Sequence, residues 1–558
     1  MQNAQKYKPL YYLPPECINN WVERDRLEKA PAWCSVDLRD GNQALVTPMS
    51  LDEKISYYRF LLGVGFKEIE VGFPAASETE YEFLRTLIDE GMIPDDVTIQ
   101  VLTQSRPHII EKTFAALKGA KRAVVHLYNS TSQPQREQVF KMDKGEIIDI
   151  ARDGARLFNS LAASMPETTF TFEYSPESFT GTEPEFALEI CNAVIDIWKP
   201  TPNHKVIINL PATVETSMPH VYAWQIAYLD KYLNHRENVI ISLHPHNDRG
   251  TGVAAAELGL LAGADRVEGT LFGNGERTGN VDILTLALNL YTHGIDPGLN
   301  LSDMPGIVKT YEQATGLPVS PRHPYAGRLV FAAFSGSHQD AIAKGMAFRK
   351  RQTEDFWTVP YLPLDPADVN REYDADVIRI NSQSGKGGIA YILEQKFGYN
   401  LPKGFRPEVG HYIKDISDKG HKELSPQEIL DAFTAEYVGV QGRLILNDLE
   451  LTRERGGQNK AQVTITFDGS TSEFTGRGNG PIDAVARALR MVEKSLNFSI
   501  DLSHYSQDAL EGGSDARAVS YIGLTDGNSS PCWGVGVDSD TTMSAVYALV
   551  SAINRQLR

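Results

Sequence analysis

Residues 239–248 read Val-Ile-Ile-Ser-Leu-His-Pro-His-Asn-Asp, an apolar run that leads into two histidines separated by one residue. The run predicts a β-strand, with His244 and His246 at its C-terminal end. Because side chains two positions apart on a strand point to the same side, both imidazoles can face one point in space. Two protonated rings would repel each other there, whereas a divalent metal would bind both. A surface pair that caps a loop is the alternative for this motif taken alone.

The same order, a β-like run followed by a helical pattern, repeats from about residue 32 to residue 294. The β-like runs cover residues 33–38, 68–72, 98–102, 123–127, 169–174, 206–210, 239–243 and 266–271. Helical patterns lie between them, among them residues 52–62, 80–89, 147–162, 185–197, 221–233 and 253–262, and residues 280–291 follow the last run. This α/β pattern, over roughly 250 residues, predicts a (β/α)8 TIM barrel. An open doubly wound sheet is the alternative.

Functional residues of a TIM barrel stand at the C-terminal ends of its strands and in the loops that follow. Polar candidates occur at these positions in unit after unit: Asp40, His126, Glu173, Ser175, Glu177, Thr213, His244, His246 and Asn280. Packing alone does not require polar side chains at one end of every unit. The pattern therefore favours a barrel with a functional site at that end, and Asp40 is a good candidate for a third metal ligand.

The alternation stops after residue 303, which suggests further domains. We expect an N-terminal extension at 1–30, the barrel at 31–305, small mixed helical subdomains at 306–436 and a C-terminal α+β domain at 437–558. The last part repeats weakly: strands 461–467 and 472–475 precede helix 482–495, and strands 518–524 and 532–537 precede helix 543–557. Two such β-β-α halves leave room for a small ligand between them or between two copies. A plain dimerisation or packing domain is the alternative.

Composition narrows the class of protein. The chain has 558 residues, a net charge of −18 and no basic stripe, so we expect no nucleic-acid partner. Its four cysteines are scattered, which fits a reducing cytosol rather than a disulfide framework. No run is long and apolar enough for a signal peptide or a membrane span. These features predict a cytoplasmic protein without a membrane partner.

Three motifs resemble those of the metal-dependent acyl-CoA condensing barrels: D-L-R-D-G-N-Q at 37–43, L-H-P-H-N-D-R-G-T-G at 243–252 and F-G-N-G-E-R-T-G-N at 272–280. Within that class the chain is most similar to the α-isopropylmalate synthase family, in its long form with a leucine-sensing tail. Further stretches carry the resemblance at residues 125–132, 172–183, 209–215, 335–342, 359–363 and 381–388. It therefore spans essentially the whole chain.

The resemblance assigns four residues to a divalent metal: Asp40, His244, His246 and Asn280. Two nitrogen and two oxygen donors are compatible with Mg²⁺, Mn²⁺ or Zn²⁺. In an octahedral site, a 2-oxo acid could fill the two remaining positions with a carboxylate oxygen and its ketone oxygen. The metal would then act as a Lewis acid on the carbonyl under attack.

The resemblance also implies roles for the surrounding residues. Arg39 would stabilise the developing alkoxide, although a salt bridge across the barrel mouth is the plain alternative. His126, Ser175 and Thr213 would bind the 2-oxo acid together with Glu177, which counts among the catalytic residues. His338 would be the general base, supplied by the partner subunit of a homodimer and assisted by Tyr361. A core role for His126 and a helix-terminal role for His338 are the alternatives.

The implied reaction condenses acetyl-CoA, the co-substrate, with 3-methyl-2-oxobutanoate to give 2-isopropylmalate and CoA, at the start of leucine biosynthesis. Leucine would be the allosteric inhibitor, bound in the tail near Ala516 and Ala518, after the glycine pair at 512–513. A sister synthase that makes citramalate or homocitrate is the main alternative. An acyl-CoA lyase on the same barrel and a catalytically silent leucine-binding protein are two others.

Overall fold

The computed structural model describes residues 3–333, 335–350, 356–373, 386–420, 424–454, 456–495, 498–510, 516–525 and 531–558. The chain forms two compact units. The first comprises Met1–Phe331 and Leu364–Glu372, and the second comprises Ala332–Pro363 and Tyr373–Arg558.

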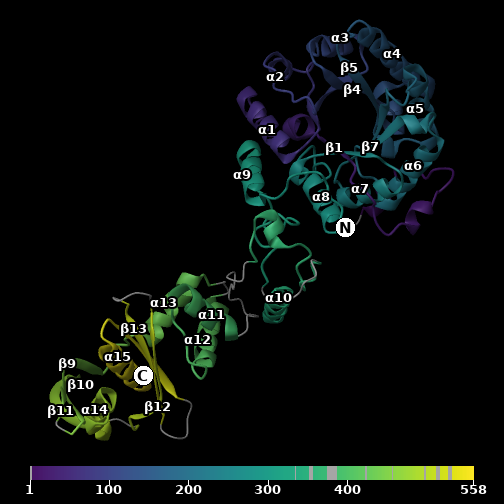
Figure 1. Ribbon diagram of the computed structural model, residues 1–558. Helices are drawn as coiled ribbons and strands as arrows, with labels where there is room; N and C mark the ends of the chain where they lie inside the picture. The colour runs from purple at the N-terminus through teal and green to yellow at the C-terminus, as the bar shows by residue number, and fades with distance from the viewer. Residues whose placement is uncertain are drawn as a thin grey trace. The chain divides into compact units, whose positions relative to one another are not determined.

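The first unit contains a closed barrel in which eight strands follow one another in sequence order. Figure 1 shows this barrel with its helices on the outside. All neighbouring strands are parallel, including β1 and β8, which close the ring. The strands are β1 Ala32–Ser35, β2 Glu68–Gly72, β3 Thr98–Gln104, β4 Arg122–Ser130, β5 Thr169–Glu177, β6 Val206–Ala212, β7 Val239–Pro245 and β8 Arg266–Gly269. The predicted TIM barrel is confirmed.

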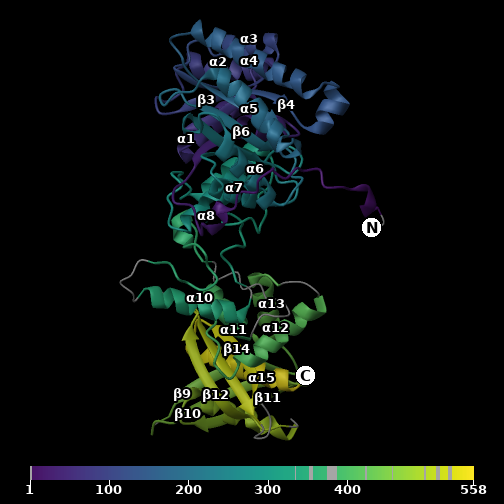
Figure 2. The ribbon, with the colours of Figure 1, turned by 90° about the vertical axis from the view of Figure 1, so that its right-hand side faces the viewer.

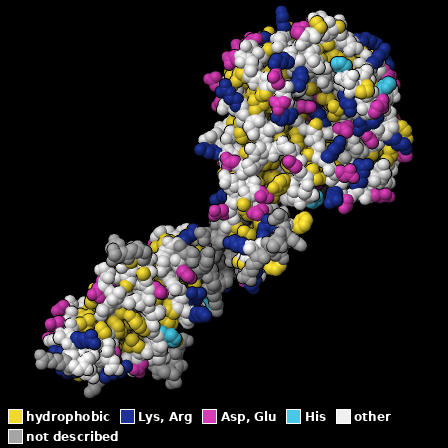
Figure 3. Space-filling view, viewed as in Figure 1, with side chains coloured by type: hydrophobic (Ala, Val, Ile, Leu, Met, Phe, Trp, Pro, Cys, Tyr) yellow, Lys and Arg dark blue, Asp and Glu magenta, His cyan; other side chains and the backbone are white. Residues whose placement is uncertain are grey.

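The helices that surround the barrel begin at clear sequence signals. Ser50 and Glu53 form a capping box at the start of α1, and Asp143 and Glu146 form another at α4. The barrel helices are α1 Leu51–Val64, α2 Glu78–Asp89, α3 Pro107–Ala116, α4 Lys144–Ala163, α5 Pro184–Trp198, α6 Pro219–Tyr232, α7 Gly252–Leu261 and α8 Ile283–Tyr291, followed by α9 Met304–Thr315. On the face seen in Figure 3, charged side chains of both signs are interspersed over these helices.

The first strand is shorter than predicted. β1 ends at Ser35, and residues Asp37–Gly41 form one turn of π-helix instead of continuing the strand. The Gly41 amide donates to the Val36 carbonyl at 3.1 Å, which is the five-residue spacing of a π-turn. The prediction of strand up to residue 38 was wrong because a buried Leu38 fits a tight turn as well as a strand. This turn presents Arg39 and Asp40 at the barrel mouth.

The second unit combines helices with two three-stranded antiparallel sheets. Its helices are α10 Gly336–Arg349, α11 Lys386–Phe397, α12 Arg406–Gly420, α13 Pro426–Tyr437, α14 Pro481–Leu489 and α15 Thr541–Gln556. Its strands are β9 Leu444–Arg453, β10 Asn459–Phe467, β11 Ser470–Gly478, β12 Asp501–Ala509, β13 Ala518–Thr525 and β14 Cys532–Asp538. Figure 2 shows both sheets of this unit with their helices.

Each half of the C-terminal region has three strands and a helix, so the predicted β-β-α pattern was one strand short. The missed strands are β9 and β12, which lie at the edges of their sheets. Only Leu444 is buried in β9, and no residue is buried in β12. An edge strand that is mostly solvent-exposed lacks the alternation of apolar and polar residues by which a strand is recognised.

The sheet β12–β13–β14 has apolar side chains on both faces. Ile522 and Leu524 of β13 join the core beneath α14 and α15, whereas Val519 and Tyr521 join a second core with α11, α12 and α13. Tyr437 belongs to this second core and is buried. Helices α11–α13 and the sheet β12–β13–β14 therefore stabilise each other, although they lie on opposite sides of residue 437 in the sequence. Among the described helices, none is long and apolar enough to cross a membrane.

Candidate active site

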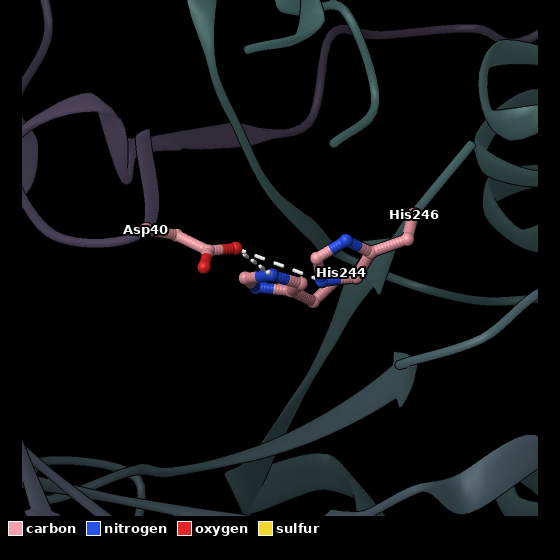
Figure 4. A group of neighbouring side chains, drawn as sticks. All are labelled: Asp40, His244 and His246. Atoms are coloured by element: carbon pink, nitrogen blue, oxygen red, sulfur yellow. Dashed lines mark hydrogen bonds and ion pairs between the residues drawn. The ribbon is translucent and has the colours of Figure 1, made fainter. Parts of the chain in front are cut away.

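Three of the four predicted metal ligands converge at the C-terminal end of the barrel, as Figure 4 shows. Asp40 comes from the π-turn after β1, His244 from β7, and His246 from the residue that follows β7. One carboxylate oxygen of Asp40 lies 3.3 Å from Nε2 of His244 and 3.6 Å from Nε2 of His246. All three side chains are buried. The strand-end geometry expected for the two histidines is therefore present, with Asp40 facing both rings.

Asn280 lies beside this cluster because its backbone pairs with that of His246. The glycine-rich loop before it permits this approach. Gly275 has φ +156°, and a Cβ there would lie 2.1 Å from the Asn280 side chain. Gly279 has φ +95°, and a Cβ there would lie 1.8 Å from a backbone oxygen of the same loop. Only glycine fits these two positions.

The electrostatics of the cluster favour one positive charge on the histidine pair. Burial opposes ionisation of Asp40, but the Arg39 guanidinium and the two imidazoles hold its pKa well below its usual range. Burial also disfavours a charged His244, yet hydrogen bonds with Asp40 and Glu268 raise its pKa from 6.5 to about 9. Burial and the neighbouring charge of His244 lower the pKa of His246 from 6.5 to about 4.

The donor set fits a divalent metal. Within the described part of the chain, the side-chain oxygen Oδ1 of Asn280 and the ring nitrogen Nδ1 of His246 are buried without a hydrogen-bond partner, which is uncommon for polar atoms in a folded protein. Asp40, His244 and His246 each offer a ligand atom within 4.8 Å of the others. The ring nitrogen Nδ1 of His244, which points away from Asp40, donates a hydrogen bond to Glu268 over 2.8 Å. A hydrogen bond of this kind orients a metal-binding imidazole.

A cavity of about 250 Å³ opens beside the cluster. Of the residues predicted from the sequence, it is lined by Arg39, Asp40, His126, Ser175, Glu177, Thr213, His244 and His246. Arg39 is held by ion pairs with Glu70 and with Asp40. Arg39 therefore does form salt bridges, as the plain alternative expects, but the same side chain also lines the cavity.

His126 and Ser175 form a hydrogen-bonded pair on the cavity wall. Nε2 of His126 lies 2.7 Å from the Ser175 hydroxyl, and Nδ1 lies 3.0 Å from Glu70. Glu177 accepts from Ser130, and the Thr213 hydroxyl accepts from a backbone amide at 2.9 Å. His126 is buried, and of these two partners Ser175 lines the cavity whereas Glu70 is fully buried in the barrel.

Comparison with known proteins places this site in a family. Residues 30–310 match the family described as HMGL-like, residues 328–394 match the alpha-isopropylmalate synthase post-catalytic domain-like family, and residues 423–557 match the LeuA allosteric (dimerisation) domain. The 2-isopropylmalate synthase of Desulfitobacterium hafniense is 58% identical over 558 residues, which is 100% of this chain and 99% of the relative. The chain belongs to the 2-isopropylmalate synthase family.

Two further members of the family are similar over nearly their whole length. The 2-isopropylmalate synthase of Helicobacter hepaticus is 57% identical over 99% of this chain and 99% of the relative. That of Acetoanaerobium sticklandii is 54% identical over 100% of this chain and 97% of the relative. The family resemblance inferred from the sequence motifs is confirmed, and the protein is an enzyme.

The two family residues expected from outside the barrel lie in the second unit. The rings of His338 and Tyr361 stack on each other, with centroids 3.9 Å apart and an interplanar angle of 18°. Both side chains are exposed, and Tyr361 has φ +64°, a left-handed conformation that is rare for a bulky residue. The structure thus brings this pair together, in a unit separate from the barrel.

The expected regulatory residues are only partly described. Ala518 is the first residue of β13 and is buried, and Ala516 is half-buried. The glycine pair at 512–513 lies outside the described residues, as does most of the motif at 381–388. Side chains alternate along a strand, so Ala518 shares a face with Ser520, whose hydroxyl accepts from Ser544 of α15 at 2.7 Å.

Sequence reasoning missed several side chains around the cavity. Gln43, Leu102, Tyr128, Asn209, Pro211, Glu276 and Arg277 also line it. Glu70 and Glu268, which hold Arg39 and His244, were missed as well. A signal for these two existed, because each is a charged residue within an apolar strand, at Ile69-Glu70-Val71 and at Val267-Glu268.

Asp37 connects, through hydrogen bonds, the turn that carries Asp40 and the loop that carries Asn280. It is buried at the start of the π-turn and accepts hydrogen bonds from the Leu271 amide after β8, from Ser35 at 2.8 Å and from Tyr57. Burial raises its pKa from 3.8 to about 7, although these hydrogen bonds oppose the shift. The folded protein therefore keeps Asp37 protonated over a pH range in which the unfolded chain releases that proton.

We expect Asp37→Asn to weaken the pH dependence of stability. A raised carboxyl pKa contributes stability that is fully present below 3.8 and is lost as pH rises to about 7. Over that range the variant should lose about 2–4 kcal/mol less than the wild type. Denaturant unfolding at a series of pH values measures this, and Asp153→Asn on the surface of α4 is the control. Parallel curves for Asp37→Asn and the wild type would contradict the expectation.

Proposed function

We propose that the protein condenses acetyl-CoA with 3-methyl-2-oxobutanoate to give 2-isopropylmalate and CoA, the first committed step of leucine biosynthesis, in the cytoplasm. The observation that carries the proposal is the convergence of Asp40, His244 and His246 with Asn280 at the mouth of a barrel of this family. The adjoining cavity is small enough to suit a short 2-oxo acid.

Asp40, His244, His246 and Asn280 would hold a divalent cation, Mg²⁺, Mn²⁺ or Zn²⁺. Such an ion supplies Lewis-acid polarisation of a ketone carbonyl. Arg39 would stabilise the negative charge that develops on the ketone oxygen, because its ion pairs with Glu70 and Asp40 hold the guanidinium in place. His126, Ser175 and Thr213 would bind the 2-oxo acid, and Glu177, which also lines the cavity, would act with them.

His338 and Tyr361 are the proposed acid–base pair. The group that removes a methyl proton from acetyl-CoA must act as a general base, and histidine is the side chain that does so most often in enzymes. The stacking of Tyr361 on His338 would hold the imidazole in one orientation while the phenol hydroxyl serves as acid or positions water. We propose that this pair acts in the site of the partner subunit of a homodimer, consistent with the match to a dimerisation domain.

The lining of the cavity favours a branched apolar 2-oxo acid over one with a second carboxylate. Leu102 and Pro211 offer an apolar surface for an isopropyl group. A second carboxylate would require an available cation, but Arg39 is paired with Glu70 and Asp40, and Arg277 is paired with Asp248 over 2.8 Å. This argues for 3-methyl-2-oxobutanoate over the substrate of a homocitrate synthase.

A panel of 2-oxo acids tests the proposed reaction. We expect release of free CoA thiol from acetyl-CoA to have its highest kcat/KM with 3-methyl-2-oxobutanoate. Pyruvate lacks the two methyl groups of this substrate. Its kcat/KM should be lower by about 10–200-fold for each missing methyl group, the usual discrimination of an apolar pocket. Highest efficiency with pyruvate would identify a citramalate synthase, and highest efficiency with 2-oxoglutarate a homocitrate synthase.

The metal assignment predicts the effect of ligand removal. His246→Ala and Asp40→Ala should each lower turnover more than about 100-fold, since the cation contributes several kcal/mol to stabilising the transition state. Both variants should stay folded, because strand-end residues of a barrel serve function rather than the core. His204→Ala, at an exposed loop position, is the matched control. Metal content and thiol release are the measurements, and full activity of either variant in chelated buffer would refute the assignment.

We propose that leucine binds the C-terminal sheets and inhibits the barrel. The match to an allosteric domain and the small side chains near the start of β13 support this. Ala518→Phe should fill the site and weaken inhibition about 5–150-fold, the usual range of an allosteric coupling, while turnover without leucine stays nearly unchanged. Turnover against leucine concentration measures the effect, with Ala115→Phe on the exposed surface of α3 as control. An unchanged inhibition curve for Ala518→Phe would place leucine elsewhere.

A further inference from the structure

Glu173 is a buried carboxyl in the middle of the barrel that the proposed reaction leaves without a role. It belongs to β5, its side chain is fully buried, and neither of its carboxyl oxygens has a hydrogen-bond partner among the residues that the structure describes. Buried carboxylates are normally paired or hydrogen-bonded, because an isolated buried charge is costly. The absence of such partners points to a carboxyl group that is not ionised.

The groups that face Glu173 favour its neutral form. His126 lies 3.5 Å from Oε1 and Arg266 lies 3.6 Å from Oε2, while Glu268 and Glu70 bring negative charge from β8 and β2. Arg266 is already engaged with Glu68 and Glu268. Burial, followed by the charge of Glu268, raises the pKa of Glu173 well above its usual range, with Arg266 opposing and Glu70 adding to the shift.

A proton suits this position better than a metal ion does. His126, Glu173 and Glu268 are close enough together to offer three ligand atoms. However, the Arg266 guanidinium lies 2.8 Å from Glu268 and 3.6 Å from Glu173, and a cation bound there would be repelled. Both ring nitrogens of His126 are also engaged, with Glu70 and with Ser175.

The hydrogen bonds of His126 determine where the Ser175 hydroxyl points. The carboxylate of Glu70 can only accept, so Nδ1 of His126 carries the hydrogen of a neutral ring. Nε2 must then accept from Ser175. The same hydroxyl oxygen accepts from the Asn209 amide at 3.0 Å. In this state Ser175 has no hydrogen left to donate into the cavity, although a bound carboxylate would require one.

We propose that Glu173 stores a proton which passes to Nε2 of His126 when the anionic substrate binds. The O–H bond of Glu173 breaks and an N–H bond forms on His126, while the electron pair stays on the carboxylate, which faces Arg266. His126 then donates to Ser175, and the Ser175 hydroxyl hydrogen turns to the substrate carboxylate. Glu173 is thus a positioning residue, and its role rests on the proposed function in that His126 and Ser175 face a 2-oxo acid.

This transfer places a positive charge on His126, close to the negative substrate carboxylate, and takes no proton from water. The bound anion therefore lies near a protonated His126. Because the proton only moves from Glu173 to His126, the net charge of the barrel interior changes only by the charge of the anion itself. Glu173→Gln has nearly the same size and is neutral, but its amide cannot give up a proton. In that variant the proton that Glu173 would supply must come from the solvent, whose proton concentration falls as pH rises.

The first test compares kcat/KM for 3-methyl-2-oxobutanoate as a function of pH in the wild type and Glu173→Gln. We expect a loss of about tenfold in the variant at mildly alkaline pH, from the missing hydrogen bond to a charged group, and recovery at mildly acidic pH. Glu68→Gln removes a carboxylate from the other side of Arg266 and is the matched control; it should follow the wild type. Parallel profiles for Glu173→Gln and the wild type would overturn the proposal.

The second test measures the protonation of Glu173 directly, without relying on turnover. At a pH above the pKa of about 7 of Asp37, where that carboxyl is ionised, infrared spectra of the ligand-free wild type should contain the C=O stretching band of a protonated buried carboxyl. The band should be absent in Glu173→Gln and in the equally neutral Glu173→Leu, and kept in Glu68→Gln. Addition of 3-methyl-2-oxobutanoate should reduce the band. Absence of any band that both Glu173→Gln and Glu173→Leu lose overturns the stored proton, and a Glu173 band unchanged by a substrate that is turned over overturns the transfer. If no 2-oxo acid is turned over, the proposed function fails, while the ligand-free band still decides the state of Glu173.

Discussion

The hydrogen bonds and ion pairs of the buried Glu268 carboxylate are the interactions on which the rest of the site at the barrel mouth depends. It accepts hydrogen bonds from Gln100 on β3 and Asn209 on β6, and it also binds Arg266 on β8 and His244 on β7. Burial opposes its ionisation, but the Arg266 guanidinium and His244 hold its pKa well below the usual range. A buried charge of this kind costs several kcal/mol unless its partners are in place, so four strands must be in register for the carboxylate to be satisfied.

This constraint orients the proposed metal ligands. Because Nδ1 of His244 is engaged by Glu268, its Nε2 can face only toward Asp40. Arg39 is held in the same way by Glu70, which also contacts His126. A polar network therefore supports the mouth of the barrel, in which Glu70 and Glu268, which do not line the cavity, orient Arg39, His126 and His244, which do. Such support keeps a site within the narrow geometry that catalysis requires.

Several parts of the fold could be predicted from the sequence because a local pattern encodes them. Eight alternating apolar and helical segments predicted the barrel, and the H-x-H motif at 244–246 predicted two converging imidazoles. The errors occurred where local pattern is weak. β1 ends before residue 38 because Asp37 is satisfied by the Leu271 amide, a contact across 234 positions of sequence. β9 and β12 were missed because edge strands expose nearly all of their side chains.

The sequence by itself determined the order of the barrel elements, the family and eight of the residues that line the cavity, since periodicity and motifs are properties of neighbouring residues. Only the tertiary structure decided which polar groups satisfy one another inside the barrel. Glu70, Glu173 and Glu268 are equivalent as isolated carboxyls, yet one binds Arg39, one lacks any hydrogen-bond partner and one connects four strands. The protonation of each depends on charges brought close by folding, and those distances are not encoded in any local stretch of the chain.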